Sequence, residues 1–387
     1  MRLLCSLSSR SSLNKEVMVI RGEQNYKRMA QILWFVGFCG EMPVSLAVRI
    51  DGHPEWNRHV VYRAVELGYL SVYRRQYSRW IIRTLRLTDK GLDYIGAYDS
   101  KGLRYILATK HGGVVRRNQI EKTLRCCALA TATVMAHSAG AEILPGRKPQ
   151  LGKHTSTSRT QLTGPVFYSA YELRQGFASL DTSTVPKTSR MLGVIVSGKS
   201  AFILYYTGRT RMYWMRNQEE NVTAMLKTLL AGAGIEVNQI NQVLIGENFQ
   251  LAIRIARYGV RNEGKYFTLS DEYDHCYFLT NNRAGDQLLS LLIHRDRRLA
   301  FERAILQDYE PCDVSNRIYD AQTPDLHRPV ALGYPFDLLQ LINLDPLRCA
   351  SKHKPILLCL DYQTDAIQEL VGPDIEVRGI DLEEVKP

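Results

Sequence analysis

The chain has 387 residues, of which 45% are hydrophobic and 23% are charged, as in an ordinary globular protein of two or three domains. Its net charge of +11 is unevenly placed, because residues 21–130 contain 19 Lys plus Arg against 9 Asp plus Glu, whereas residues 131–387 contain 28 against 29. This distribution is typical of a polyanion-binding module joined to a neutral domain. The sequence has neither about 18 consecutive apolar residues nor a basic amphipathic helix, which argues against a membrane role.

Residues 1–22 are expected to form a flexible tail, since their apolar piece is too short for a secretory signal. The eight cysteines are scattered without a CxxC pair, and the spacing of Cys349, His353 and Cys359 matches no common zinc module. We therefore expect no metal site and no cofactor, and a reducing cytoplasm as the setting.

Residues 23–100 are predicted to form a winged helix-turn-helix domain. Asp51-Gly52-His53 has the composition of a turn, and it separates two of the expected helices. Apolar side chains at helical spacing predict helices over residues 23–37, 42–50 and 54–67. The last of these would lie in the DNA major groove.

A basic hairpin is predicted to follow these helices. Gly68 suits the left-handed conformation that ends a helix. Apolar residues at 69–73 and 80–87 predict two strands, and the tip at residues 74–79 is polar and basic. Thr88 is the expected N-cap of the next helix.

The third helix and the hairpin carry the candidate DNA-binding residues. Asn and Arg side chains pair bidentately with adenine and guanine edges, and arginines outside the groove bind phosphates. The candidates are Asn57, Arg58, His59, Tyr62 and Arg63 on the outward side of the helix, Arg74, Arg75 and Arg79 in the hairpin, and Arg116 and Arg117 beyond it. The alternative is a domain for protein contact, in which these side chains are simply solvated.

Residues 101–165 are predicted to comprise a basic segment, a long helix over residues 114–139 and a linker. Two uses of the helix stay open: it either mediates dimerisation or covers the sheet of the next domain. Residues 145–165 are rich in Pro, Gly, Ser, Thr and Lys, a composition typical of a linker or an exposed loop.

Residues 166–387 alternate strands and helices, which predicts an α/β domain around a mixed sheet and an α+β class for the whole chain. Residues 166–176 fit a strand or a short helix, and Gly198-Lys199 predicts a hairpin. Further strands are predicted over residues 191–197, 201–207, 210–215, 241–246, 275–280, 355–361 and 375–380. Helices are predicted over residues 217–232, 247–259, 285–307 and 363–371.

The order hairpin, third strand, helix, strand over residues 166–260 resembles the core of restriction-endonuclease-like folds. Nucleases of this fold hold Mg²⁺ with an acid on one strand and a Glu/Asp-x-Lys on the next. The corresponding segments, residues 194–197 and 203–206, contain no carboxylate. We therefore predict an inactive relative with no catalytic residues. The chain also lacks the GxxxxGK[ST], GxGxxG and GxSxG motifs.

The winged helix, the LTDKG sequence at residues 87–91, the basic segment around His111 and the long helix before a nuclease-like domain resemble the replication-relaxation family over residues 23–260. These proteins are carried by plasmids and integrative conjugative elements of Gram-positive bacteria. The resemblance implies a cytoplasmic, DNA-binding accessory of replication, transfer or transcriptional control. The strands lack the acidic positions that the family's core can carry, which argues against strand cleavage but not against DNA binding.

The partners expected on this interpretation are double-stranded DNA, a second copy of the chain and the replication or transfer proteins of the element, with no membrane. The rival interpretation is a metal-dependent nuclease or relaxase-like enzyme whose carboxylates come from other positions. A Mg²⁺-dependent nicking assay separates the two.

Overall fold

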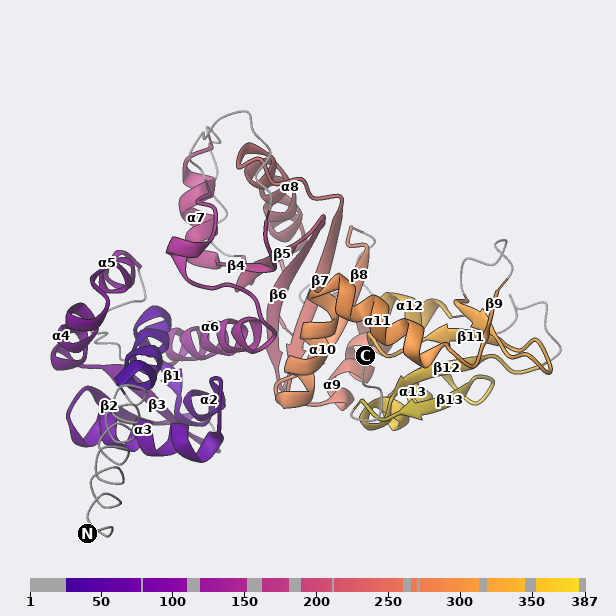
Figure 1. Cartoon of the computed structure of the whole chain (residues 1–387), viewed down its shortest axis with the longest axis horizontal. Helices are drawn as coiled ribbons and strands as arrows, with labels where there is room; N and C mark the ends of the chain where they lie inside the picture. The colour runs from indigo at the N-terminus through magenta and orange to yellow at the C-terminus, as the bar shows by residue number, and fades with distance from the viewer. Residues whose placement is uncertain are drawn as a thin grey trace, which may run out of the picture. The chain divides into compact units, whose positions relative to one another are not determined.

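The computed structural model describes residues 26–77, 79–109, 119–151, 162–180, 189–210, 212–259, 266–269, 272–312, 319–344 and 353–382. These residues form helices and mixed sheets (Figure 1), so the predicted α+β class is confirmed. The chain divides into two compact units, Met1–Val134 and Met135–Pro387. The tail expected at residues 1–22 lies outside the described residues. Within the described part, no helix is both long and apolar enough to cross a membrane.

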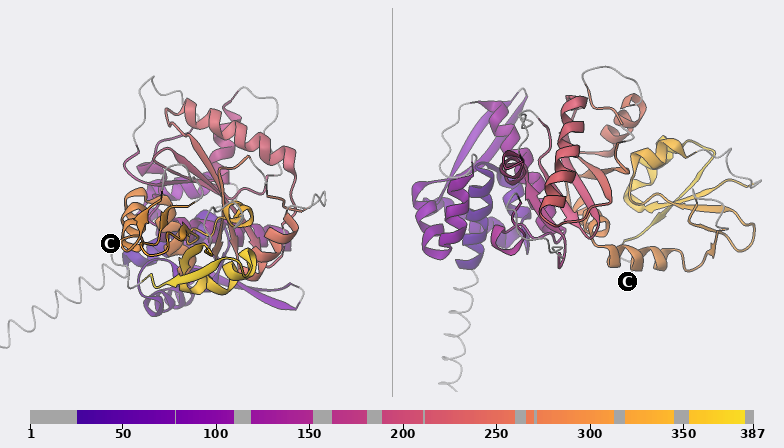
Figure 2. Two further views of the ribbon diagram at one scale, coloured as in Figure 1. Left: turned by 90° about the vertical axis from the view of Figure 1, so that its right-hand side faces the viewer. Right: turned by 90° about the horizontal axis from the view of Figure 1, so that it is seen from above.

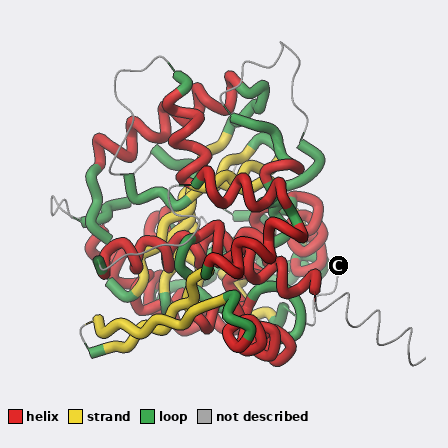
Figure 3. The backbone as a smooth tube through the Cα atoms, turned by 90° about the vertical axis from the view of Figure 1, so that its left-hand side faces the viewer, coloured by secondary structure: helices red, strands yellow, loops and turns green. Residues whose placement is uncertain are grey.

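The first unit consists of helices and one small antiparallel sheet. It starts with a helix over residues 26–39, as predicted. The elements that follow are β1 (Met42–Pro43), α2 (Val44–Arg49), α3 (Pro54–Glu66), β2 (Leu70–Tyr77), β3 (Trp80–Leu87), α4 (Asp89–Tyr98) and α5 (Ser100–Ala108). The strand order is β1-β3-β2, and β2 and β3 form an extended two-stranded ribbon (Figure 3).

Local sequence signals account for the boundaries of these elements. Pro54 begins α3, where its missing N–H costs nothing, and Gly68 follows the helix with a φ of 73°. The predicted cap of α4 is confirmed, because Thr88 Oγ1 accepts a hydrogen bond from the Gly91 amide at 3.1 Å. The sequence prediction missed α5, whose first amides are capped by Asp99.

Tertiary pairing changed one predicted boundary. Residues 42–50 were expected to form a single helix, but Met42 and Pro43 pair with Leu85 and Thr84 of β3 as a short strand. Pro43 has an extended ψ of 137° and precedes the first residue of α2. The helix therefore starts at Val44, once the chain has left the sheet.

The long helix α6 (Ile120–Ser138) carries the chain from one unit to the next, since the boundary falls after Val134. Its prediction over residues 114–139 is confirmed from residue 120 onwards, and residues 110–118 lie outside the described part. Neither of the two uses expected for this helix is tested by the fold of a single chain.

The second unit contains two five-stranded sheets. The first is built from β4 (Val166–Ser169), α7 (Ala170–Ala178), β5 (Gly193–Ser197), β6 (Ser200–Gly208), α8 (Arg216–Gly232), β7 (Gln239–Gly246), α9 (Phe249–Gly259) and β8 (His275–Thr280). Strands β4, β5 and β6 are antiparallel, and β6, β7 and β8 are parallel. The predicted β5–β6 hairpin is confirmed, with Gly198 at a φ of 55°.

The strand predicted over residues 210–215 is wrong. Met212 and Trp214 are buried whereas Tyr213 and Met215 are exposed, so the segment alternates as a strand would. Nevertheless its described residues form no ladder, and Tyr213 pairs with Tyr266 through an isolated bridge. The third antiparallel strand of this sheet is instead β4, which lies earlier in the chain.

The second sheet repeats the topology of the first. Helix α10 (Arg283–Ile293) still packs on β5 and β8 of the first sheet, and α11 (Arg295–Ile305) follows it. The elements of the second sheet are β9 (Glu310–Pro311), β10 (Ala321–Gln322), β11 (Pro329–Leu332), α12 (Leu338–Asn343), β12 (Ile356–Leu360), α13 (Thr364–Val371) and β13 (Glu376–Ile380). Strands β9 to β11 are antiparallel and β11 to β13 parallel, in the order β9-β10-β11-β12-β13. This sheet lies in the orange-to-yellow part of the ribbon (Figure 2). Each sheet is therefore an antiparallel meander followed by two parallel crossovers.

The helix predicted over residues 285–307 is two helices, α10 and α11. They meet at His294, whose backbone is extended and whose ring Nε2 lies 3.0 Å from the Ala139 carbonyl oxygen. The predicted terminal strand, helix and strand at residues 355–380 are confirmed as β12, α13 and β13.

Candidate nucleic-acid interface

The outward face of α3 displays most of the side chains expected there. Arg58, His59, Tyr62 and Arg63 are all exposed. Arg58 Nη1 lies 2.6 Å from Glu55 Oε2, and Arg63 pairs with a glutamate one turn further on. Exposed pairs of this kind contribute about 0–1 kcal/mol, so both guanidinium groups can exchange their partners for a ligand at low cost.

Asn57 was predicted on this outward face, and that prediction is wrong. The side chain is fully buried, and its Nδ2 donates to the carbonyl oxygens of Val48 (2.9 Å), Asp51 (3.1 Å) and Ile50. Residue 57 lies four positions before Val61, so helical periodicity places it on the apolar face. Asn57 therefore holds the turn between α2 and α3 and is not available to read a base.

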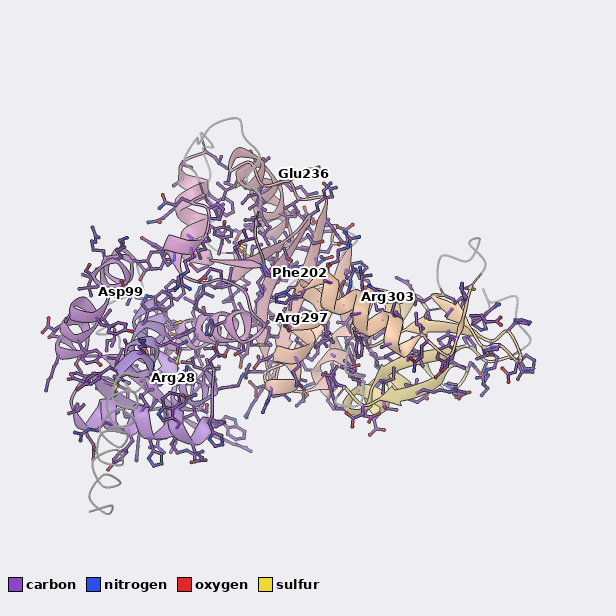
Figure 4. All side chains as sticks on the ribbon, in the orientation of Figure 1. Arg28, Asp99, Phe202, Glu236, Arg297 and Arg303 are labelled. Carbon is purple, nitrogen blue, oxygen red and sulfur yellow. The ribbon has the colours of Figure 1, made fainter. Side chains whose placement is uncertain are left out.

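Arg28 completes the same buried network and was missed by the sequence prediction. It lies on the helix over residues 26–39 (Figure 4). Its Nε donates to Asn57 Oδ1 and its Nη2 to the Ile50 carbonyl, each at 2.6 Å. Burial lowers the pKa of Arg28, and nearby Asp51 opposes that shift. A basic residue from the positively charged first third of the sequence thus fastens the α2–α3 turn to the helix over residues 26–39.

The β2–β3 hairpin has two halves with different surroundings. We call residues 74–77 and 79–83 its outer half, and residues 70–73 and 84–87 its inner half, as the cross-strand pairing divides them. In the outer half, Arg74 and Arg79 are exposed and Arg75 is half-buried. The other two arginines predicted to bind DNA, Arg116 and Arg117, are not in the hairpin and lie outside the described residues. The hairpin thus presents basic side chains beyond the body of the first unit.

The inner half is fastened by a buried acid. Glu41 is fully buried and its Oε2 lies 2.8 Å from Nη2 of Arg86, which is only 3% exposed. Thr84 donates to Glu41 Oε1 at 2.6 Å, and Thr123 of α6 donates to Oε2 at 3.0 Å. The Glu41 carboxylate, directly before β1, therefore bonds to β3 and α6, and the Arg86 guanidinium balances its charge.

The first sheet of the second unit contains no carboxylate on β5 or β6. The nearest buried acid is Glu219 of α8, which accepts hydrogen bonds from Ser189 Oγ (2.9 Å), Tyr205 OH (3.1 Å) and the Arg190 amide (2.7 Å). Burial is also the main reason that the pKa of Tyr205 is raised. The Glu219 carboxylate thus accepts hydrogen bonds from neutral donors and holds residues 189–190 and β6 against α8. These bonds give the cluster a structural role.

A metal centre is not assembled anywhere among the described residues, where no three His, Cys, Asp or Glu side chains come together as ligands. The Cys349 position considered above lies outside the described part. The basic face of the first unit is therefore the candidate site that the described geometry offers.

No family model matches the chain, and no curated protein or solved structure matches it either. The resemblance to the replication-relaxation family therefore remains a sequence-based prediction. What the chain does has to be inferred from the surfaces and side chains described above.

Proposed function

We propose that this protein binds double-stranded DNA, with α3 in the major groove and the β2–β3 hairpin on the phosphate backbone, as a winged helix-turn-helix does. The observation that carries the proposal is the charge of the hairpin. Residues 67–88 contain five arginines and no acidic residue. Arg86 is neutralised internally by Glu41, whereas Arg74, Arg79 and Arg83 are exposed to an incoming polyanion.

The position of α3 supports the same function. The helix follows α2 after a four-residue turn at residues 50–53, and its outward side carries Arg58, Tyr62 and Arg63. The buried contacts of Arg28 and Asn57 with that turn make the pair of helices rigid, and recognition is more precise on rigid elements.

The second unit would then serve assembly or partner contact. Three antiparallel strands, the crossover helix α8 and the parallel strand β7 support its interpretation as a nuclease-like core. The lack of acids on β5 and β6 favours an inactive version of that core. Together with the sequence resemblance to the replication-relaxation family, these features support a DNA-binding accessory or regulatory protein of a mobile genetic element.

The proposal is tested by measuring the affinity of the full chain for a short duplex at several salt concentrations. Each lost phosphate contact flattens the slope of log affinity against log salt by about 0.9. We expect Arg74→Ala/Arg79→Ala to flatten it by about twice that amount. The matched control is Arg295→Ala/Arg303→Ala, which removes two exposed arginines of α11 in the second unit.

A wild-type chain that binds no duplex, or two double variants with the same slope, would contradict the proposal. Exposed arginines far from any ligand affect binding only through net charge, so the control separates contact from general attraction.

A further inference from the structure

Large apolar side chains are concentrated on the outer half of the hairpin. Tyr77 is 46% exposed, Trp80 is 58% exposed and Ile81 is 70% exposed. Val72 and Tyr73, which come directly before the outer half on β2, are also among the exposed hydrophobic residues. Such a group on a small, protruding ribbon marks a binding surface, because nothing in the fold of the ribbon requires these side chains to face solvent.

The strand register places two of these aromatic residues together. Tyr77 and Trp80 are direct cross-strand partners at the outermost described pair of the hairpin. Directly opposed residues share one face of a two-stranded sheet, with Cβ atoms about 4.5–5.5 Å apart. The two exposed side chains therefore project from the same face of the ribbon, and we call this pair the platform.

A pair of arginines lies on the opposite face of the same ribbon, because successive side chains of a strand alternate between its two faces. Arg74 and Arg83 are direct cross-strand partners, and both are exposed. Like charges in this position destabilise a hairpin unless a ligand neutralises them. Arginine binds phosphate bidentately and also stacks on planar groups. The ribbon thus offers an aromatic face and a basic face, which together fit a ligand that is both anionic and aromatic.

We propose that the outer half of the hairpin stacks on unpaired bases, so that the preferred ligand is DNA in which a duplex meets a single-stranded segment. This inference rests on the proposed function, because α3 would hold the duplex part. In an intact duplex the bases stack on one another and leave only phosphates for the hairpin. Unpaired bases offer their faces, and each stacked base contributes about 1–3 kcal/mol.

The test compares the affinity of the full chain, at one salt concentration, for three ligands. They are a blunt duplex, the same duplex with a single-stranded tail, and the same tail made abasic. We expect the tailed duplex to bind about tenfold more tightly than the blunt one, the size of one stacking contact. The abasic tail keeps its phosphates but offers no bases, so it should lose that advantage.

Variants at the platform locate the effect. Tyr77→Ala and Trp80→Ala should abolish the preference for the tailed duplex while blunt-duplex affinity stays within about twofold of wild type. Trp80→Phe keeps an aromatic ring and should retain the preference. That result would show that the loss in Trp80→Ala comes from the missing ring and not from a misfolded hairpin. The matched control is Tyr98→Ala, which removes a ring on α4 that is 52% exposed.

The outcomes separate the two levels of inference. Failure to bind any of the three ligands overturns the proposed function itself. Equal affinity for blunt and tailed duplexes, or a preference that survives the abasic tail or Trp80→Ala, overturns only the stacking proposal. Tight binding to phosphatidylserine vesicles that Trp80→Ala abolishes, without any tail preference, also overturns it and assigns the platform to a membrane surface.

Discussion

The two halves of the β2–β3 hairpin use the same residue type for opposite purposes. In the inner half, Arg86 is buried against Glu41, a residue 45 positions away in the sequence. In the outer half, Arg74 of β2 and Arg83 of β3 are exposed on strands that contain no acid. An arginine therefore acts as a structural or a binding residue according to whether the fold brings a carboxylate to it.

Helix α3 repeats this contrast at adjacent positions. Asn57 is buried among backbone carbonyl groups, whereas Arg58 faces outwards with only a solvent-exposed glutamate beside it. Neighbouring polar residues on one helix thus have separate roles. The comparison predicts that variants of the buried polar residues change stability, whereas variants of the exposed arginines change binding.

The largest effect is expected for Glu41→Ala. It leaves Arg86 buried without its acid and removes the acceptor used by Thr84 and Thr123, which should cost about 3–5 kcal/mol in the free energy of unfolding. Denaturant titration measures the loss. The matched control is Glu55→Ala, an exposed acid whose removal should cost less than about 0.5 kcal/mol. Equal stability of the two variants would contradict the distinction between the halves.

Asn57→Ala should be next in size. The carbonyl oxygens of Val48, Ile50 and Asp51 would lose a buried donor, at a cost of about 1–3 kcal/mol for a group left unsatisfied. Thermal unfolding is measured for this variant and for Arg58→Ala, and only Asn57→Ala should be less stable than the wild type. If Asn57→Ala had normal stability but no longer selected its preferred DNA site, Asn57 would belong to the recognition surface instead.

Arg58→Ala should change binding and leave stability nearly unaltered. If α3 enters the major groove, the variant loses one base contact worth about 1–3 kcal/mol of discrimination. Preference should relax at one or two base positions, while non-specific affinity persists because the hairpin arginines still contact phosphates. Site selection from random duplexes, at one salt concentration, tests this. A variant that selects the same site as wild type would rule out α3 as the recognition helix.

The smallest effect is expected at the junction of the two halves. Arg86 lies over the ring of Tyr73, with the guanidinium carbon 4.3 Å from the ring centroid. Tyr73→Leu removes this cation–π contact and should cost about 0.5–1 kcal/mol of stability, whereas Tyr73→Phe should retain most of it. Denaturant titration measures the stability of both variants. Their duplex affinity, measured in parallel, shows whether Tyr73 also contributes to DNA binding. Normal stability with weakened DNA binding would move the binding surface inwards to include Tyr73.

The sequence by itself determined the local structure of this protein. Helical spacing, Gly68 and the Thr88 cap located α3 and α4, and Gly198 located the β5–β6 turn, because these signals act between residues a few positions apart. It also located the excess of basic charge. The exposed part of the candidate site, with Arg58, Arg74 and Arg79, followed from the same local patterns.

Only the tertiary structure decided the pairings between distant segments. It placed Met42 against Leu85, brought carbonyl acceptors of the α2–α3 turn to Asn57 and gave Arg86 its acid. It also showed that residues 210–215 alternate without joining a sheet, and that the short strands β9 and β10 complete a second copy of the first topology. The reason is physical: a strand or a buried ion pair needs a partner, and that partner can lie anywhere in the chain.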